Sequence, residues 1–101
     1  MEESDSLKLG GNIVLTGFKD IDRSTMTIVK KIVGNYLKKA STTLDNIEEF
    51  KLSLKKPENK NVFEMRSQII ANGRSYNTEV QEHNLFFALN SALQKLDNVI
   101  K

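Results

Sequence analysis

The stretch VFEMRSQIIANGRSYNTEVQ, residues 62–81, decides the fold of this chain. Apolar and polar residues alternate on both sides of Asn72-Gly73, a pattern typical of strands with one buried face. An Asn-Gly pair predicts a two-residue hairpin turn, because both residues tolerate the positive φ that such a turn requires. The positions that this pattern places toward the core are Phe63, Met65, Ser67, Ile69, Ala71, Tyr76, Thr78 and Val80.

Two more strands are predicted upstream of this hairpin. Phe50, Leu52 and Leu54 alternate with polar residues, and a loop at residues 56–61 with the only proline follows them. Residues 13–18 form a short apolar run that is rich in strand formers. Residues 1–11 are polar, begin with acidic side chains and end in two glycines, so we expect a flexible tail there.

A helix is predicted at residues 25–40, with Asp22 or Ser24 placed to cap it. At about 100° per residue its apolar residues fill one side, and four lysines fall on the opposite arc. Gly34 interrupts the pattern at a cost of roughly 1 kcal/mol relative to alanine, and a small residue there suits close packing. The apolar positions are Met26, Val29, Ile32, Val33, Tyr36, Leu37 and Ala40, and the lysines are Lys30, Lys31, Lys38 and Lys39.

A second helix is predicted at residues 85–100. Its apolar stripe is about 140° wide, and the opposite side is largely uncharged. Phe86 borders the stripe, whereas Phe87 lies well outside it and is a candidate for contact with a partner. The stripe consists of Leu85, Ala88, Leu89, Ala92, Leu93, Leu96, Val99 and Ile100.

The predicted order is therefore β-α-β-β-β-α in a single α+β domain at residues 12–101. A four-stranded sheet with both helices on one face buries both helix stripes and leaves the other sheet face in water. Sequential hairpins favour the last three strands lying side by side.

Composition excludes most catalytic chemistry. The chain has no cysteine and one histidine, His83, so a thiolate metal site is excluded and a zinc site or serine triad is very hard to build. We expect no enzymatic activity, no cofactor, no metal and no small-molecule substrate. The start MEESDS is unlike a signal peptide, and no apolar run approaches the roughly 18 residues of a membrane span. We therefore expect a cytoplasmic protein without membrane contact.

Charge is distributed unevenly along the chain. The formal net charge is +2, but residues 7–101 hold 15 basic and 10 acidic side chains, a net of +5. This excess favours polyanionic partners, although an ordinary solvated surface fits it equally well.

Several short motifs accompany the predicted order of elements. The first strand ends in Leu15-Thr16-Gly17, and the hairpin reads Ala71-Asn72-Gly73-Arg74. The second helix follows with Asn84-Leu85-Phe86, Ala88-Leu89-Asn90 and Lys95-Leu96. Together with the order of elements, these motifs resemble the ribosome hibernation-promoting factor family.

The resemblance implies a domain of the double-stranded-RNA-binding type that docks in the small ribosomal subunit and inhibits translation by occupancy. It assigns contacts with rRNA phosphates to Lys30, Lys31, Lys38, Lys39 and Lys95. Lys55 and Lys56 beside the loop, and Arg74 beside the turn, would extend this footprint. Lysines at strand ends also discourage pairing between sheet edges, so both roles stay open for Lys55 and Lys56.

Two departures from the family pattern support an alternative. The second helix carries few basic residues, and Phe87 stands where the family usually has a small residue. The alternative is a protein-interaction or self-associating domain, such as a homodimer, with Phe87, Asn90 and Gln94 at the interface. His83 precedes the second helix, where a pH switch, a base contact and a purely structural role are all open.

Overall fold

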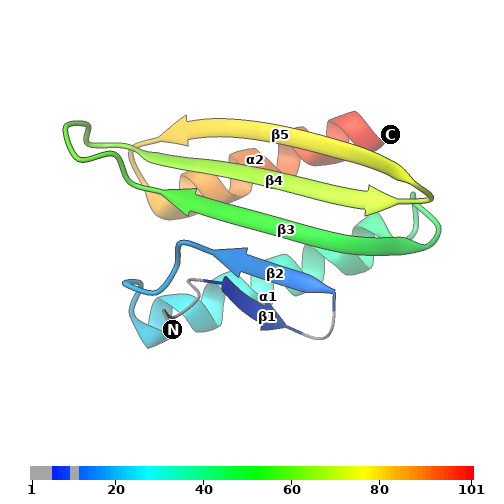
Figure 1. Ribbon diagram of the computed structural model, residues 1–101, viewed down its shortest axis with the longest axis horizontal. Coiled ribbons are helices and arrows are strands. Elements are labelled where there is room, and N and C mark those ends of the chain that lie inside the picture. The colour runs from blue at the N-terminus through cyan, green and yellow to red at the C-terminus, as the bar shows by residue number, and fades with distance from the viewer. Residues whose placement is uncertain (1–5, 10–11) are drawn as a thin grey trace, which may run out of the picture.

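The computed structural model describes residues 6–9 and 12–101. A five-stranded sheet forms one layer, and both helices cover the same face of it (Figure 1). The elements are β1 (Ser6–Leu9), β2 (Ile13–Thr16), α1 (Arg23–Ala40), β3 (Ile47–Lys55), β4 (Phe63–Ala71), β5 (Arg74–Glu82) and α2 (Leu85–Ile100).

The predicted α+β fold is confirmed, because β2 to β5 and the two helices follow the order β-α-β-β-β-α. The strands lie in the order β1-β2-β3-β4-β5. β2 is parallel to β3, and α1 connects these two strands. β3, β4 and β5 are antiparallel neighbours, as the hairpin pattern favours.

The predicted tail at residues 1–11 is wrong for Ser6–Leu9, which form the additional strand β1. This strand pairs antiparallel with β2, from Ser6 opposite Thr16 to Leu9 opposite Ile13. The Ser6 and Thr16 hydroxyl oxygens lie 3.2 Å apart. Residues 1–5 and 10–11 of the predicted tail lie outside the described residues. The strand reads SLKL, a short alternation of polar and apolar residues that is typical of a strand. The acidic residues before it and the two glycines after it concealed this signal.

The Asn72-Gly73 hairpin is confirmed. Asn72 has φ 54° and Gly73 has φ 77°, as expected for a type I′ turn. Two hydrogen bonds also hold the turn against the start of β3. The Asn72 side-chain amide donates to the Asp45 carbonyl at 3.0 Å, and the Gly73 N–H donates to the Glu48 carboxylate at 3.2 Å.

The core lies between the sheet and the helices. Of the positions predicted in the hairpin, those of β4 after Phe63 are buried, while those of the edge strand β5 are half-buried. The stripe of α2 is buried or half-buried, with the exception of Val99 near its end, which is 53% exposed. Asp22 is the N-cap of α1, and its carboxylate accepts the Thr25 N–H at 3.1 Å and the Thr25 hydroxyl at 2.7 Å.

Gly34 does not serve close packing, contrary to the expectation from the sequence. A Cβ at this position would meet no atom within 4 Å. We expect Gly34→Ala to raise the free energy of unfolding by about 0.5–1 kcal/mol, because alanine loses less backbone entropy in a helix than glycine. Urea denaturation measures this change, and a variant no more stable than the parent protein would contradict it.

Candidate nucleic-acid interface

Helix α1 concentrates the positive charge of the molecule. It contains five basic residues and no acidic residue, whereas the rest of the chain contains 10 basic and 13 acidic residues, a net of −3. Charge of one sign that is gathered on one element produces a local positive potential even where the net charge is small. The surface of α1 is therefore the strongest candidate for contact with an anionic partner.

The four predicted lysines of α1 are all exposed, but they point in different directions. Lys31 and Lys38 lie on the outer crest, about 20° apart around the helix and about 10 Å apart along its axis. Lys39 lies on the flank that faces α2, and Lys30 lies on the opposite flank. Within residues 6–9 and 12–101, no acidic side chain forms an ion pair with Lys30, Lys31 or Lys38.

Lys39 and Lys101 converge on Asp97, between the ends of the two helices. Their Nζ atoms lie 3.7 Å and 3.1 Å from the Asp97 Oδ2 atom, and Asp97 is 7% exposed. The hydrogen bond from Lys101 is the main cause that holds the pKa of Asp97 below its usual value, against the opposing effect of burial. Asp97 thus lies beside Lys39, whereas Lys31 and Lys38 have no acidic partner among the described residues.

Tyr36 belongs to the core, as the sequence predicts. Its hydroxyl is buried and has no hydrogen-bond partner among the described residues. Burial, followed by the negative charge of Asp97, raises the pKa of Tyr36 to about 12. The phenol therefore stays neutral beside the ion pairs of Asp97.

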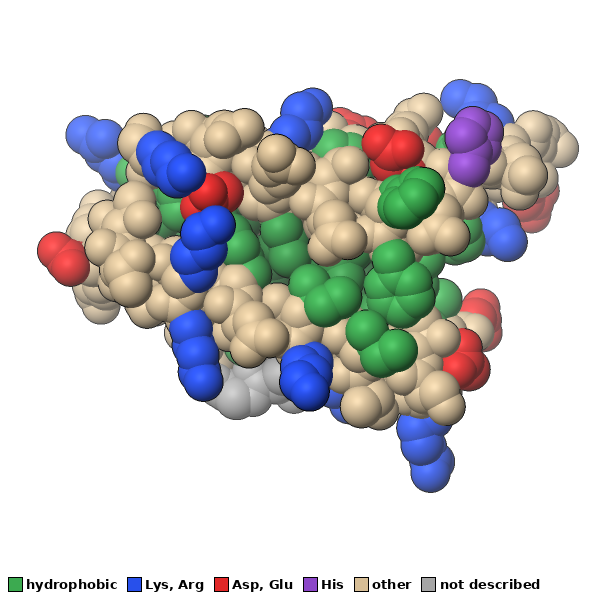
Figure 2. Space-filling model, turned by 180° about the vertical axis from the view of Figure 1, so that it is seen from behind, with side chains coloured by type: hydrophobic (Ala, Val, Ile, Leu, Met, Phe, Trp, Pro, Cys, Tyr) green, Lys and Arg blue, Asp and Glu red, His purple; other side chains and the backbone are tan. Residues whose placement is uncertain are grey.

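Exposed apolar side chains accompany the lysines on the helix side of the molecule. Phe87 is 64% exposed and Ile28 is 49% exposed, and each lies near the start of its helix. Both helices begin at the same end of the molecule (Figure 1). Figure 2 shows the helix side, with hydrophobic side chains gathered between the helices and Lys and Arg side chains around them. Ile28 was missed by the sequence analysis, although it lies off the α1 stripe as Phe87 lies off that of α2.

The three residues predicted for a protein interface share the outer side of α2. Phe87, Asn90 and Gln94 are all exposed and lie within about 60° of one another around the helix. The structure thus brings together the residues of the alternative prediction as well.

The other predicted basic residues are separated from α1. Lys95 lies on the far flank of α2, and its Nζ atom donates to the Glu79 carbonyl of β5 at 3.3 Å. Lys55 follows the buried Leu54 and so points to the sheet face opposite the helices. Lys56 is in the loop after β3, with its Nζ atom 5.3 Å from the centre of the Phe63 ring. Arg74 is the first residue of β5, and β5 begins at the end of the sheet opposite to the end of β3 (Figure 1).

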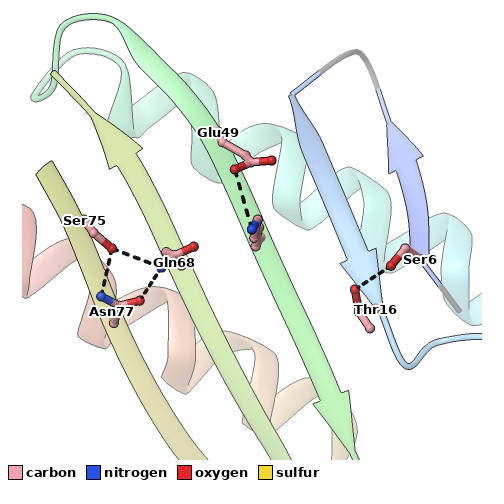
Figure 3. Close-up of polar contacts among 7 residues, drawn as sticks. Ser6, Thr16, Glu49, Gln68, Ser75 and Asn77 are labelled. Carbon is pink, nitrogen blue, oxygen red and sulfur yellow. Dashed lines mark hydrogen bonds and ion pairs between the residues drawn. The ribbon is translucent and has the colours of Figure 1, made fainter. Parts of the chain in front are cut away.

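The outer face of the sheet is polar, and its side chains bond with one another. The Gln68 amide donates to the Ser75 hydroxyl at 3.0 Å and to the Asn77 side-chain oxygen at 2.8 Å (Figure 3). Two ion pairs on this face, Lys51 with Glu49 at 3.7 Å and Arg66 with Glu79 at 3.5 Å, balance its charges. No outward position of β3, β4 or β5 carries an aromatic residue, so this face offers no platform for stacked bases.

His83 has a structural contact in the loop before α2. Its Nδ1 atom lies 2.8 Å from the Asn61 carbonyl oxygen, which ties the loop after β3 to the start of the helix. The next residue, Asn84, caps α2 by accepting the N–H groups of Phe86 and Phe87 at 2.8 Å and 3.2 Å. The cap fixes the first turn of α2 and with it the place of Phe87.

The described part of the chain offers neither a metal-binding cluster nor a membrane-spanning helix. No group of three or more His, Cys, Asp or Glu residues there could hold a metal ion. Among the same residues, no helix is both long enough and apolar enough to cross a membrane.

No protein-family model matches the sequence, and no curated protein is significantly similar to it.

Proposed function

We propose that this protein binds structured RNA through α1 and acts by occupying its site, without catalysis. The observation that carries the proposal is the charge of α1, five basic residues and no acidic residue in a chain that is otherwise net negative. Contacts with phosphates require only positive charge within reach, and they supply much of the affinity of proteins for nucleic acids.

The arrangement of the lysines suits an A-form duplex. With 18 residues, α1 is about 27 Å long, and its four lysines span about half of its circumference. The minor groove of A-form RNA is wide and shallow, with phosphates along both rims. A helix that lies along this groove can direct Lys30 to one rim and, once Lys39 has left Asp97, Lys39 to the other.

The apolar residues beside α1 favour RNA with unpaired bases next to a duplex. Aromatic side chains stack on splayed bases, and Phe87, which is 64% exposed, belongs to α2, which covers the same face of the sheet as α1. Ribosomal RNA offers such junctions of duplex and loop. The resemblance to ribosome hibernation factors directs the proposal to the rRNA of the small subunit, with translation inhibited because the protein occupies the place of its ligands.

The exposure of Phe87 also favours a second function, a protein-interaction domain centred on Phe87, Asn90 and Gln94. The two functions differ in their response to salt. An apolar protein contact tolerates salt, whereas neutralisation of phosphates releases counterions and weakens steeply as salt rises.

We expect Phe87→Ala to weaken RNA binding by about 1–3 kcal/mol without changing the slope of affinity against salt, because stacking displaces no counterions. Fluorescence anisotropy with a labelled RNA hairpin measures both quantities. Val99→Ala is a matched control, since Val99 is also an exposed apolar residue of α2, 53% exposed, but near its other end. If the affinity of Phe87→Ala for RNA is unchanged, Phe87 does not stack on a base.

Sedimentation through a sucrose gradient with ribosomal subunits tests the proposed function. The protein should migrate with the small subunit at low salt and dissociate as salt rises. A protein that stays at the top of the gradient at every salt concentration would rule out the ribosome as its target. Co-migration that resists salt would favour the protein-interaction function instead.

A further inference from the structure

Strand β5 is an open edge of the sheet. It pairs with β4 on one side, and no strand among the described residues pairs with its other side. Next to a two-residue turn, Ala71 and Arg74 form a hydrogen-bonded pair, and bonded and non-bonded positions alternate from there. Ser75, Asn77, Glu79 and Gln81 therefore direct their backbone N–H and C=O groups to the free edge.

The contact of Lys95 agrees with this assignment, because its Nζ atom reaches the Glu79 carbonyl from the far flank of α2. A nine-residue edge with four residues in this orientation can accept another strand. The sequence of β5 determines which strand fits.

We propose that two copies of this chain pair through β5 in antiparallel orientation, with the twofold axis at Thr78. In this register Arg74 of each copy lies opposite Glu82 of the other, and Tyr76 lies opposite Val80. The nine residues RSYNTEVQE thus pair along their whole length. On the helix-side face, opposite charges meet at both ends and Tyr76 and Val80 lie between them. In this register the hydrogen-bonded pairs are Ser75 with Gln81 and Asn77 with Glu79. These are the residues whose backbone N–H and C=O groups point to the open edge of the sheet.

Burial supports the same partner. Tyr76 and Val80 point toward the helix side but are only half-buried, since the free edge leaves them uncovered. A groove of about 440 Å³ lies between β5 and α2, lined by residues 79–82 of the strand and by Ser91, Gln94, Lys95 and Asn98 of the helix. This groove gives room for the inward-facing side chains of the second copy.

Two features of β5 oppose its pairing with a second copy, but neither prevents it. The two Glu79 side chains lie diagonally across the axis, but each is already paired with Arg66 of its own chain at 3.5 Å. Lys95 must release the Glu79 carbonyl, which then accepts a backbone N–H of the other copy. Because Lys95 covers the edge in the single chain, it sets the concentration at which pairing begins.

This inference does not depend on the proposed function, because β5 and α1 lie on different parts of the molecule (Figure 1). Sedimentation velocity over about a hundredfold range of protein concentration, without RNA, tests it. The protein should pass from monomer to dimer. The amides of Asn77 and Glu79 should gain protection from hydrogen exchange as it does so.

Charge exchange between Arg74 and Glu82 identifies the register. Arg74→Glu and Glu82→Arg should each weaken the dimer by roughly 10- to 100-fold, because each reverses two pairs of the symmetric interface. The double variant Arg74→Glu/Glu82→Arg should restore dimerisation to within about threefold of the parent protein. Lys31→Glu on α1 is the control and should leave the dimer unchanged.

A protein that remains monomeric over the whole concentration range would overturn the inference. A dimer that the single variants leave intact, or that the double variant fails to restore, would also overturn it. Phe87→Ala then shows whether the dimer uses α2 instead. Circular dichroism must establish that each variant is folded, because Arg74 is exposed but Glu82 is half-buried and accepts a hydrogen bond from the Ser91 hydroxyl at 3.4 Å.

Discussion

Replacement of Lys31 and Lys38 by glutamate is expected to weaken RNA binding on the order of 100-fold at moderate salt. Both side chains lie on the outer crest of α1, and neither is paired with a described acidic residue. Each reversal removes a phosphate contact and places a carboxylate in its position. Fluorescence anisotropy with a labelled RNA hairpin measures the loss.

The matched control is Lys51→Glu/Arg66→Glu. It changes the net charge by the same amount, but these residues are on the outer face of the sheet, where Glu49 and Glu79 pair with them. We expect this control to lose much less affinity than the α1 variant. Equal losses in the two variants would mean that the protein attracts RNA by overall charge and not by α1.

Gly17→Ala is expected to produce the largest loss of stability, at least about 3 kcal/mol. Gly17 follows β2 with φ 86°, a conformation that alanine adopts only with strain. A Cβ at this position would also overlap the carbonyl oxygen of Leu54 in β3. The backbone of a central strand cannot move aside as a flexible side chain can, so the parallel pairing of β2 with β3 would be disturbed.

Gly73→Ala separates the two causes of this loss. Gly73 also has a positive φ, 77°, but a Cβ there would meet no atom within 4 Å. We expect it to cost about 1–2 kcal/mol, the strain of the left-handed conformation alone. Urea denaturation of both variants gives the comparison. If Gly17→Ala is no more destabilised than Gly73→Ala, the contact with Leu54 does not constrain this turn.

The sequence predicts those parts of the fold that depend on local patterns. The Asn72-Gly73 turn and the alternation around it determine the hairpin, and the three-to-four-residue spacing determines both helices. β1 was missed because its alternation covers only four residues, SLKL, between a run of acidic residues and two glycines, and its pairing with β2 is a long-range contact. The environment of Gly34 depends on which elements lie near it, and helical spacing does not contain this information.

The candidate interface could be predicted to a similar extent. The α1 lysines share one helix, so their exposure follows from helical spacing. The pairing of Lys39 with Asp97 could not be predicted, because it depends on the packing of α1 against α2. Lys55 and Arg74 lie near hairpin ends in the sequence, but these ends lie at opposite ends of the sheet (Figure 1).

The measurement that tests the central claim most directly is a titration of ¹⁵N-labelled protein with an RNA hairpin, followed by NMR. We expect the amide shifts to change along α1 and near Phe87, with little change at Lys51, Arg66 and Gln68 on the outer sheet face. The changes should reverse when salt is added, because the contacts are made with phosphates. Shift changes confined to the outer sheet face, or none at saturating RNA, would contradict the assignment of α1 as the RNA-binding surface.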